Sequence, residues 1–352
     1  MTDYQSPSSM HTSNLIKKTE EKGYDGILSV NLSNIKYLSG YETTSFAFCV
    51  FSENPVVYTS SLDMENAKLH SHIEVREFES VSKLVDDLFD EGLVNLAIED
   101  SLSIGLYEKL SNKFQGKLNL TIDSILEDER MIKTYDETVK IQEATKIAQK
   151  AFSEVDVLKQ YAHGRSEWEL SYELGRLMRK YGAESESFDT IVATGPNSSL
   201  PHSTPRHREL ETPILIDWGA KYKGYCSDNT RTIVFSEKQE EIFNIVLEAH
   251  DKTIKSIRSG MKACDVDKVA RDIITEYVYA DNFIHSTGHS LGLDIHEKPN
   301  VSTRDETVLQ DNMFITVEPG IYLEGEFGVR IEDTVMIKNK AHVIGDLPQI
   351  LN

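Results

Sequence analysis

Two aspartates flank a short hairpin-like segment beyond the middle of the chain, and this arrangement restricts the possible fold more than any other feature. The apolar run 214–216 leads into Asp217, and Asp228 precedes the strand-like run 230–235, with a glycine-containing turn between the two runs. The pattern predicts a β-hairpin in which Asp217 and Asp228 face each other, with Cβ atoms roughly 4.5–5.5 Å apart. Carboxylates at that distance repel each other unless a cation lies between them. The segment therefore predicts a metal site.

A second acidic hairpin has the same construction. The apolar run 313–317 ends at Glu318, the run 329–337 contains Glu332, and the midpoint between the two glutamates is Gly325, in a turn-prone segment. Glu318 and Glu332 are therefore expected to approach each other across a ladder. Charged cross-strand residues are common at sheet edges, so one such hairpin would be weak evidence. Two of them favour a shared cation-binding site.

Between the hairpins lies a glycine-containing loop with three histidines, His285, His289 and His296, and His202 lies upstream in a turn-rich segment. Histidine is the commonest metal ligand and a frequent acid–base group. Three surface or structural histidines are the alternative explanation, but the whole chain has only 11 histidines. The clustering therefore favours a functional loop.

The composition argues against several classes of function. The chain has 352 residues, of which 39% are hydrophobic and 27% charged, as is typical of a globular protein with a substantial core. A net charge of −21 argues against nucleic acid or an anionic membrane as a partner, and no apolar run reaches the ~18 residues of a transmembrane helix. The three cysteines include no CxxC pair, which predicts a reducing, cytoplasmic location. Cys226, between the two aspartates, could be a catalytic thiol, but we interpret it as a half-buried strand residue.

Residues 1–125 alternate strand-like and helical patterns, which predicts a small α/β domain. The chain changes character near residues 125–133, so we place the domain junction there and assign residues 126–352 to a second domain. This domain is expected to begin with a long helix over 135–161, followed by a helix that begins at the capping box of Ser166 and Glu169. Its last part returns to strands and turns.

A family resemblance becomes apparent from four segments: DWGAKYKGYCSDNTRT, HSTGHSLGLDIHEKP, TVEPGIY and GVRIEDTV. Together they resemble the metallopeptidases of the pita-bread fold, which include prolidases, Xaa-Pro aminopeptidases and methionine aminopeptidases. The resemblance covers almost the whole chain and applies in particular to short prokaryotic prolidases and Xaa-Pro aminopeptidases. It implies an α/β (α+β) fold: an N-terminal creatinase/prolidase-like α/β domain, then a pita-bread domain with two pseudo-symmetric halves around a curved antiparallel sheet. Methionine aminopeptidases lack such an N-terminal domain and are disfavoured.

The resemblance also implies a set of metal ligands and catalytic groups. The five ligands fall on Asp217, Asp228, His289, Glu318 and Glu332. Four carboxylates and one imidazole suit two divalent ions, for which we expect Mn²⁺, with Co²⁺ or Zn²⁺ as alternatives. Asp228 and Glu332 would bridge the two ions, and Glu318 would also act as general base.

The same resemblance assigns a second group of residues to the substrate. His202 and His296 are expected to hydrogen-bond the scissile carbonyl or the tetrahedral intermediate. His285 and Tyr322 match residues of the pocket wall. Arg330 points to the same strand face as Glu332, where it could pair with a ligand carboxylate or contact the substrate.

The implied reaction is hydrolysis of Xaa-Pro peptide bonds in a small peptide with proline at its second position. Prolidases that cut only dipeptides usually carry an arginine four residues after the histidine equivalent to His296, and this arginine binds the free carboxylate of the dipeptide. Here that position is Asn300. We nevertheless expect an Xaa-Pro dipeptidase, with an Xaa-Pro aminopeptidase acting on longer peptides as the alternative. A non-catalytic peptide-binding protein of the same fold is a third possibility, although such proteins lose metal ligands and none is missing here. The resemblance also implies a homodimer.

Overall fold

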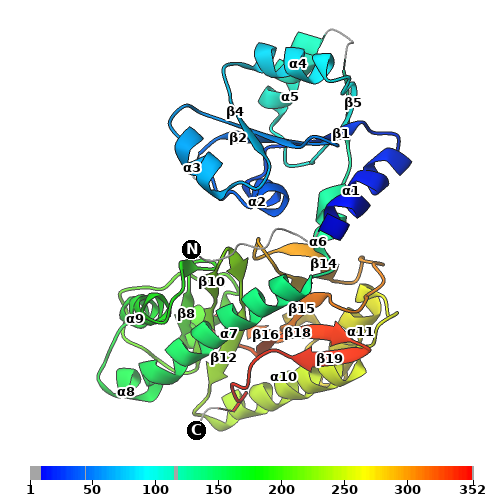
Figure 1. Ribbon diagram of the computed structural model, residues 1–352. Coiled ribbons are helices and arrows are strands. Elements are labelled where there is room, and N and C mark those ends of the chain that lie inside the picture. Colours follow the sequence, from blue (N-terminus) through cyan, green and yellow to red (C-terminus); the bar gives the residue numbers. More distant parts are fainter. Residues whose placement is uncertain (1–8, 44, 115–117, 351–352) are drawn as a thin grey trace. The chain divides into compact units, whose positions relative to one another are not determined.

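The computed structural model describes residues 9–43, 45–114 and 118–350. The chain divides into two compact units, Met1–Glu129 and Arg130–Asn352, and each combines helices with β-sheets (Figure 1). The predicted mixed α/β architecture is therefore confirmed. In the described part of the chain, no helix is both long enough and apolar enough to cross a bilayer.

A six-stranded sheet in the order β4-β3-β2-β1-β5-β6 forms the centre of the N-terminal unit. Strand β2 runs antiparallel to both of its neighbours, and the other adjacent strands are parallel. The strands are β1 (Gly26–Ser29), β2 (Ala47–Phe51), β3 (Val56–Thr59), β4 (Glu74–Glu77), β5 (Asn95–Ile98) and β6 (Asn119–Ile122). The helices are α1 (Ser9–Glu21), α2 (Leu32–Ser39), α3 (Met64–His70), α4 (Val81–Asp90), α5 (Ile104–Phe114) and α6 (Ile125–Arg130). The apolar side of α4 belongs to the same buried cluster as the central strands.

The C-terminal unit contains an antiparallel sheet in the order β15-β18-β12-β9-β8, with β19 also paired to β18. Its strands are β8 (Ile191–Thr194), β9 (Ile214–Trp218), β12 (Asn229–Ile233), β15 (Phe314–Val317), β18 (Glu332–Lys338) and β19 (Lys340–Val343). Smaller sheets contain β7 (Ser185–Glu186), β10 (Ala220–Tyr222), β11 (Tyr225–Cys226), β13 (Gly288–Ser290), β14 (Glu297–Val301), β16 (Gly320–Leu323) and β17 (Phe327–Arg330). The helices are α7 (Tyr135–Val155), α8 (Val157–Ala162), α9 (Glu167–Lys180), η1 (Gly195–Ser199), α10 (Glu237–Ser256), α11 (Ala263–Glu276) and η2 (Ala280–Asn282).

The single helix predicted over 135–161 is wrong, because the structure divides it into α7 and α8 at Asp156. This residue has φ 47°, in the left-handed region, and its side chain accepts a hydrogen bond from the Lys159 backbone N–H at the start of α8. Asp tolerates the left-handed conformation better than most residues and is a good N-cap. By contrast, the predicted capping box of Ser166 and Glu169 is present at the start of α9.

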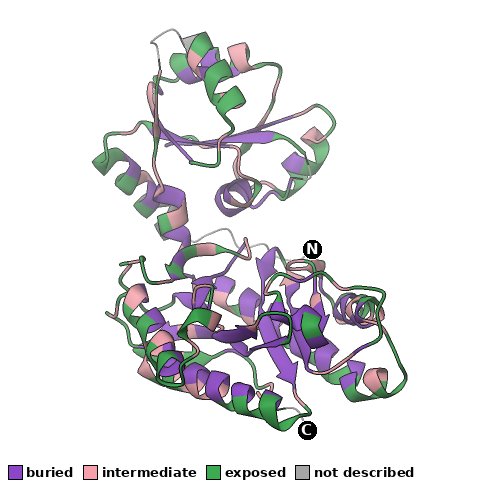
Figure 2. Ribbon diagram, turned by 180° about the vertical axis from the view of Figure 1, so that it is seen from behind, coloured by how far each residue is buried: buried purple, intermediate pink, exposed green. Residues whose placement is uncertain are grey.

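Helices cover one face of the large sheet in the C-terminal unit. The buried Trp218 ring of β9 stacks on Phe152 of α7 with ring centroids 4.2 Å apart, and its Nε1 donates a 3.0 Å hydrogen bond to the Ala148 carbonyl. Neighbouring side chains of a strand point to opposite faces, so Asp217 lies on the other face of β9, away from α7. Strands β8, β9, β12, β15 and β18 are mainly buried, and the outer sides of the helices are exposed (Figure 2). The sheet therefore has one face against helices and one face free to carry a polar site.

The four longest helices described in this unit form two pairs, α7 with α9 and α10 with α11. The first pair packs on β8 and β9, and the second pair packs around the strands from β15 to β19. The two halves thus share one antiparallel sheet, as the resemblance to the pita-bread fold implies.

Candidate metal centre

The first acidic hairpin has a register two residues away from the predicted one. Asp217 pairs with Thr230, and the predicted direct opposition of Asp217 and Asp228 is wrong. The turn consists of Lys223 and Gly224, whose φ angles of 49° and 83° are those of a two-residue turn with both central residues left-handed. The centre of the hairpin therefore lies between these two residues. Asp228 becomes the diagonal neighbour of Asp217 on the same face, still within reach of a shared ion.

Carboxylates meet in a row that crosses the sheet. Thr230 of β12 pairs with Asp217 of β9 on one side and with Glu332 of β18 on the other. The registers that flank Glu318, between β15 and β18 and between β16 and β17, both place Glu318 opposite Glu332, as predicted for the second hairpin. The Thr230 hydroxyl donates a 2.7 Å hydrogen bond to Glu332 Oε2. Directly paired residues share a face, so these side chains all project to the polar face of the sheet.

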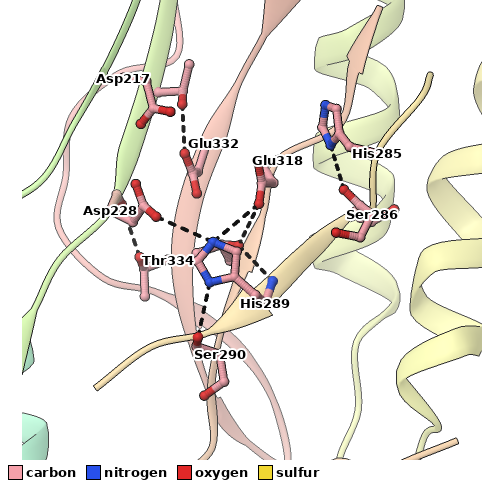
Figure 3. Close-up of polar contacts among 12 residues, drawn as sticks. Asp217, Asp228, His285, Ser286, His289, Ser290, Glu318, Glu332 and Thr334 are labelled. Carbon is pink, nitrogen blue, oxygen red and sulfur yellow. Dashed lines mark hydrogen bonds and ion pairs between the residues drawn. The ribbon is translucent and has the colours of Figure 1, made fainter. Parts of the chain in front are cut away.

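His289 reaches the row from β13, which packs beside β15. Its backbone N–H donates to Thr316 Oγ1 at 3.0 Å, and Gly288 brings β13 so close that a Cβ at this position would collide with the Thr316 carbonyl. The imidazole Nε2 lies 3.6 Å from Asp228 Oδ2 and 3.5 Å from Glu318 Oε1 (Figure 3). Nδ1 lies 3.1 Å from the Ser290 carbonyl oxygen, so a proton on Nδ1 would leave the Nε2 lone pair free for a metal.

The carboxylate oxygens at the centre of this cluster fit a divalent cation. Asp217 Oδ1, Asp228 Oδ1 and Glu332 Oε1 are buried and have no hydrogen-bond partner. Asp228, His289 and Glu332 each offer a ligand atom, and these atoms all lie within 4.8 Å of one another. Buried acceptors of this kind are costly unless a donor or cation satisfies them. A hard, oxygen-rich donor set with one imidazole suits ions such as Mn²⁺ or Zn²⁺.

The electrostatics of the metal-free cluster lead to the same conclusion. Burial raises the pKa of Asp228 well above its usual value, and Glu332 and Asp217 add to the rise. Burial also raises the pKa of Glu332, with further contributions from Glu318 and Asp217. The pKa of Glu318 rises to about 7, mainly because of burial, although Arg330 opposes the shift. Without cations, these carboxylates cannot all remain ionised at neutral pH.

Arg330 connects the carboxylates to a neighbouring tyrosine and histidine. Its Nη2 donates to Asp217 Oδ2 at 2.6 Å, and its Nη1 donates to the Tyr322 hydroxyl at 2.7 Å. That hydroxyl lies 2.9 Å from His285 Nε2, and His285 Nδ1 lies 2.7 Å from the Ser286 carbonyl. Burial, followed by the charge of Arg330, lowers the pKa of His285 to about 3, so this imidazole is neutral. Arg330 therefore occupies the predicted ion-pair role.

A cavity of about 410 Å³ brings nearly all of the predicted residues together. Its lining includes all five predicted ligands and also His202, His285, His296, Asn300 and Arg330. Apolar residues complete the wall: Phe188, Ile191, Pro201 and Ile295. The His296 ring packs edge-on to His289 with centroids 4.4 Å apart, and burial lowers the pKa of His296. Tyr322 is not among the residues that line the cavity, but its hydroxyl contacts two that do, His285 and Arg330.

Sequence reasoning missed a group of buried charges that hold the histidine loops in place. The clearest is Glu297, which follows His296 and whose side chain is only 6% exposed. One of its carboxylate oxygens accepts from Arg130 and from the Asp294 backbone N–H, and the other accepts from Lys133 at 3.1 Å. The carboxylate also fills the space where a Cβ at Gly292 would lie. Glu297 thus closes the base of the loop between His289 and His296.

Two other buried carboxylates have comparable roles. Asp267 of α11 accepts hydrogen bonds from the Thr287 backbone N–H and hydroxyl, two residues before His289. Glu167 of α9 accepts from the Thr194 backbone N–H and from Asn197, and so shapes the segment that leads to His202. Both look like ordinary helix-start or surface acids in the sequence. Of Glu167, Asp267 and Glu297, only Glu297 has a signal in the sequence, because it directly follows the predicted site residue His296.

The fold and the site together define a metal-dependent hydrolase, and comparisons with known proteins agree. Residues 139–339 match the metallopeptidase family M24, and residues 12–132 match the creatinase/prolidase N-terminal domain. The chain is 39% identical over 329 residues to an Xaa-Pro dipeptidase of Pyrococcus horikoshii, covering 92% of this chain and 93% of that protein. The chain belongs to metallopeptidase family M24.

Solved structures with similar folds span nearly the full length of the chain. An Xaa-Pro dipeptidase from Bacillus anthracis superposes with a TM-score of 0.91 at 36% identity, covering 97% of this chain and 98% of that one. An X-Pro aminopeptidase from Thermotoga maritima superposes with a TM-score of 0.88 at 35% identity, with the same coverage. The two-domain fold expected from the resemblance is thus confirmed.

Proposed function

We propose that this protein is an Xaa-Pro dipeptidase that uses two divalent metal ions to hydrolyse the bond before proline. The observation that carries the proposal is the row of buried carboxylates with unpartnered oxygens around one imidazole. Membership of family M24 and the similarity to Xaa-Pro dipeptidases support it. The catalytic domain is residues 126–352 in this proposal.

Five residues would hold the metal ions: Asp217, Asp228, His289, Glu318 and Glu332. Mn²⁺ is the ion we propose, with Co²⁺ and Zn²⁺ as alternatives that the same donors accept. Two bound ions would supply a Lewis acid for the peptide carbonyl and lower the pKa of an attacking water. Asp228 and Glu332 each offer a carboxylate oxygen within 4.8 Å of the His289 ligand atom, so they would be shared by the ions.

The remaining chemistry falls to side chains around the cavity. Glu318 is the proposed general base, because its carboxylate lines the cavity beside the other proposed ligands, where it could accept a proton from an attacking water and pass it to the leaving amine. His296 and His202 line the same cavity and would hydrogen-bond the scissile carbonyl. Neutral His285 and the buried Tyr322 would fix the orientation of Arg330 and shape the pocket wall.

A second candidate, an Xaa-Pro aminopeptidase acting on longer peptides, is favoured by one feature of the cavity. Asn300 lines it at the position where dipeptide-specific relatives are expected to carry an arginine. In the described part of the chain, Arg330 is the one lysine or arginine in the lining, and its guanidinium is engaged by Asp217 and Tyr322. A free carboxylate on the substrate therefore has no uncommitted cation to bind among these residues.

The two candidates are separated by comparing the Mn²⁺-loaded protein on Ala-Pro and on Ala-Pro-Ala. A higher kcat/KM for Ala-Pro supports the dipeptidase. A higher value for the tripeptide supports the aminopeptidase. Failure to cleave either peptide, with metal bound, would refute both.

We also propose a cytoplasmic location and a homodimeric state. The cysteines support a reducing compartment, because Cys49 and Cys226 are buried free thiols and Cys264 is also unpaired. The dimer follows from the family resemblance alone. Light scattering coupled to size-exclusion chromatography would test it, and a monomer mass near 39.9 kDa would contradict it.

A further inference from the structure

A buried arginine lies directly behind the carboxylate row. Arg231 of β12 follows Thr230 in the chain, so its side chain projects to the opposite, helix-covered face of the sheet. It is 0% exposed, although it is one of the largest and most polar side chains. Its position is unrelated to the cavity, and neither the proposed reaction nor the family resemblance gives it a role.

All five N–H donors of this guanidinium are used. Nη1 donates to the backbone carbonyls of Thr230 at 2.9 Å and Glu332 at 2.6 Å. These two residues are direct partners across β12 and β18, and on the other face the Thr230 hydroxyl bonds the Glu332 carboxylate. Arg231 therefore links strands β12 and β18 on the helix-covered face of the sheet. It does so at the Thr230–Glu332 pair, whose side chains project to the metal cluster on the other face.

The remaining donors reach Asp333 and the C-terminal segment Leu347–Gln349. Nη2 donates to Asp333 Oδ1 at 2.7 Å and to the Leu347 carbonyl at 2.8 Å, and Nε donates to the Pro348 carbonyl at 2.9 Å. Asp333 is also buried, and its Oδ2 accepts from the Gln349 side chain at 3.0 Å and lies 3.2 Å from His250 Nε2. The C-terminal segment thus supplies two of the five acceptors and one further donor to this network.

The C-terminal segment Leu347–Gln349 and the two residues before it also contact helix α7 and the apolar cluster around it. The backbone N–H of Asp346 donates to Gln149 Oε1 of α7 at 3.1 Å, and Gly345, with φ 92°, leaves no room for a Cβ beside the Gln149 amide. Leu347 packs against the apolar cluster of α7, α9 and β9. Residues 345–349 are therefore fixed on α7 at one point and on the back of β12 and β18 at another.

We infer that the C-terminal segment Leu347–Gln349, acting through Arg231 and Asp333, is a structural part of the metal centre. Arg231 is a positioning residue: it fixes the spacing and register of the strands that carry Asp228 and Glu332, and the segment holds its guanidinium in place. Partners of this kind, which orient metal ligands without touching the metal, typically contribute about 10- to 100-fold in metal affinity. The inference rests on the proposed metal site but not on the identity of the peptide substrate.

Two truncations make a matched pair for the test. One lacks residues 347–352, and the control lacks only 350–352, which removes Ile350, more than half exposed, and leaves the contacts of Leu347–Gln349 intact. The dissociation constant for Mn²⁺ is measured by calorimetry on the metal-free full chain and on each variant. We expect the shorter protein to bind Mn²⁺ at least about 10-fold more weakly and the control to bind like the full chain.

A point substitution covers the case in which the longer truncation fails to fold. Arg231→Lys keeps the charge but loses the planar set of five donors, and we expect about a 10- to 100-fold weaker Mn²⁺ affinity with the far-UV circular dichroism unchanged. Arg258→Lys is the control, because Arg258 also donates to two backbone carbonyls, of Lys255 and Ile257, but away from the metal cluster. Saturating Mn²⁺ should restore kcat in Arg231→Lys, as expected for a residue that acts only through the metal ligands.

Unchanged Mn²⁺ affinity in the folded longer truncation would overturn the inference, and so would unchanged affinity in Arg231→Lys. These outcomes differ from a failure of the proposed function, in which the full chain would bind Mn²⁺ and cleave no Xaa-Pro peptide.

Discussion

Replacement of Glu297 by glutamine is expected to destabilise the C-terminal unit substantially, because it removes the anion that two buried cations share. The side chains of Arg130 and Lys133 are 5% and 1% exposed, and the Glu297 side chain is 6% exposed. Glutamine keeps the size of the side chain and can still accept a hydrogen bond, but it carries no charge. Because one accepting oxygen becomes an amide donor, the substitution removes the charge and one acceptor without leaving a cavity.

The magnitude follows from the pKa of Glu297. Burial alone would raise it, but the charges of Lys133 and Arg130 outweigh burial and lower the pKa from 4.5 to about 2. At 1.36 kcal/mol for each pH unit of pKa difference, this corresponds to about 3 kcal/mol of stabilisation at neutral pH. Removing one partner of a buried ion pair typically costs about 3–5 kcal/mol, which agrees.

The pH dependence provides a second, independent test. The folded-state pKa of Glu297 lies below its unfolded value, so its stabilising contribution is complete above pH 4.5 and is lost as the pH falls towards about 2. The difference in unfolding free energy between the wild type and Glu297→Gln should therefore be constant above pH 5 and should shrink below pH 4.5.

Tryptophan fluorescence during urea unfolding is a suitable assay, with a chelator present so that metal binding does not contribute. Both tryptophans of the chain, Trp168 and Trp218, lie in the C-terminal unit, so the signal reports this unit alone. Glu306→Gln is the control, because Glu306 is 76% exposed in its pair with Lys262 and should contribute less than about 1 kcal/mol. A loss below about 1 kcal/mol in Glu297→Gln, no larger than that of the control, would refute the reasoning.

Three further outcomes are expected. Asp228→Asn should abolish Mn²⁺ binding and peptide hydrolysis while leaving the circular dichroism unchanged, because it removes a central ligand but no apolar packing; metal analysis of the purified variant checks this. Gly288→Ala should lower the melting temperature of the C-terminal unit by several degrees, because the added Cβ meets the Thr316 carbonyl. Overpacking strain of this kind costs about 1–3 kcal/mol, and each kcal/mol lowers the melting temperature of a unit of this size by ~2–4 °C. The Mn²⁺ affinity should weaken as the pH falls below about 7, because the pKa of Glu318 is raised and its proton must leave before the metal binds. Calorimetry in buffers of different ionisation enthalpy should detect this proton release.

The proposed ligand set could be assembled from the sequence because each of its residues lies in a motif with a local signature. For the second hairpin, we took the residue midway between the two glutamates, Gly325, as the centre of the turn. The strand register confirms this, because the turn is symmetric about Gly325 and Glu318 lies opposite Glu332. For the first hairpin, the same assumption gave a strand register that is wrong by two residues. The turn is centred on the left-handed pair Lys223–Gly224 and not on the midpoint between Asp217 and Asp228. Turn conformation, which is decided by two φ angles, set the register.

Elements that depend on tertiary context were harder to predict. Strands β4 and β6 carry little local signal, because they are edge strands whose sequences, EVRE and NLTI, are only half-buried and show no apolar run. The break of the first long helix at Asp156 has no proline or glycine to signal it. Helix and strand propensities predict secondary structure poorly where a single backbone angle or a single neighbouring strand determines it.

The charges that support the site were the least visible in the sequence. Glu167, Asp267 and Glu297 have the residue type and setting of solvated acids, but each is buried against a loop that carries a site histidine. Their partners lie far away in the chain, as Arg130 does from Glu297, so no local pattern records the pairing. Spatial proximity alone identifies them.

Hydrolysis of Xaa-Pro bonds by this protein is expected to require a pair of divalent ions held by the carboxylate row. The most direct test is a titration of the metal-stripped protein with Mn²⁺, in which proline release from Ala-Pro and bound metal per chain are measured on the same samples. We predict no proline release without metal and full activity as the content reaches two ions per chain. Hydrolysis that persists in excess chelator, or no hydrolysis at any metal content, would contradict it.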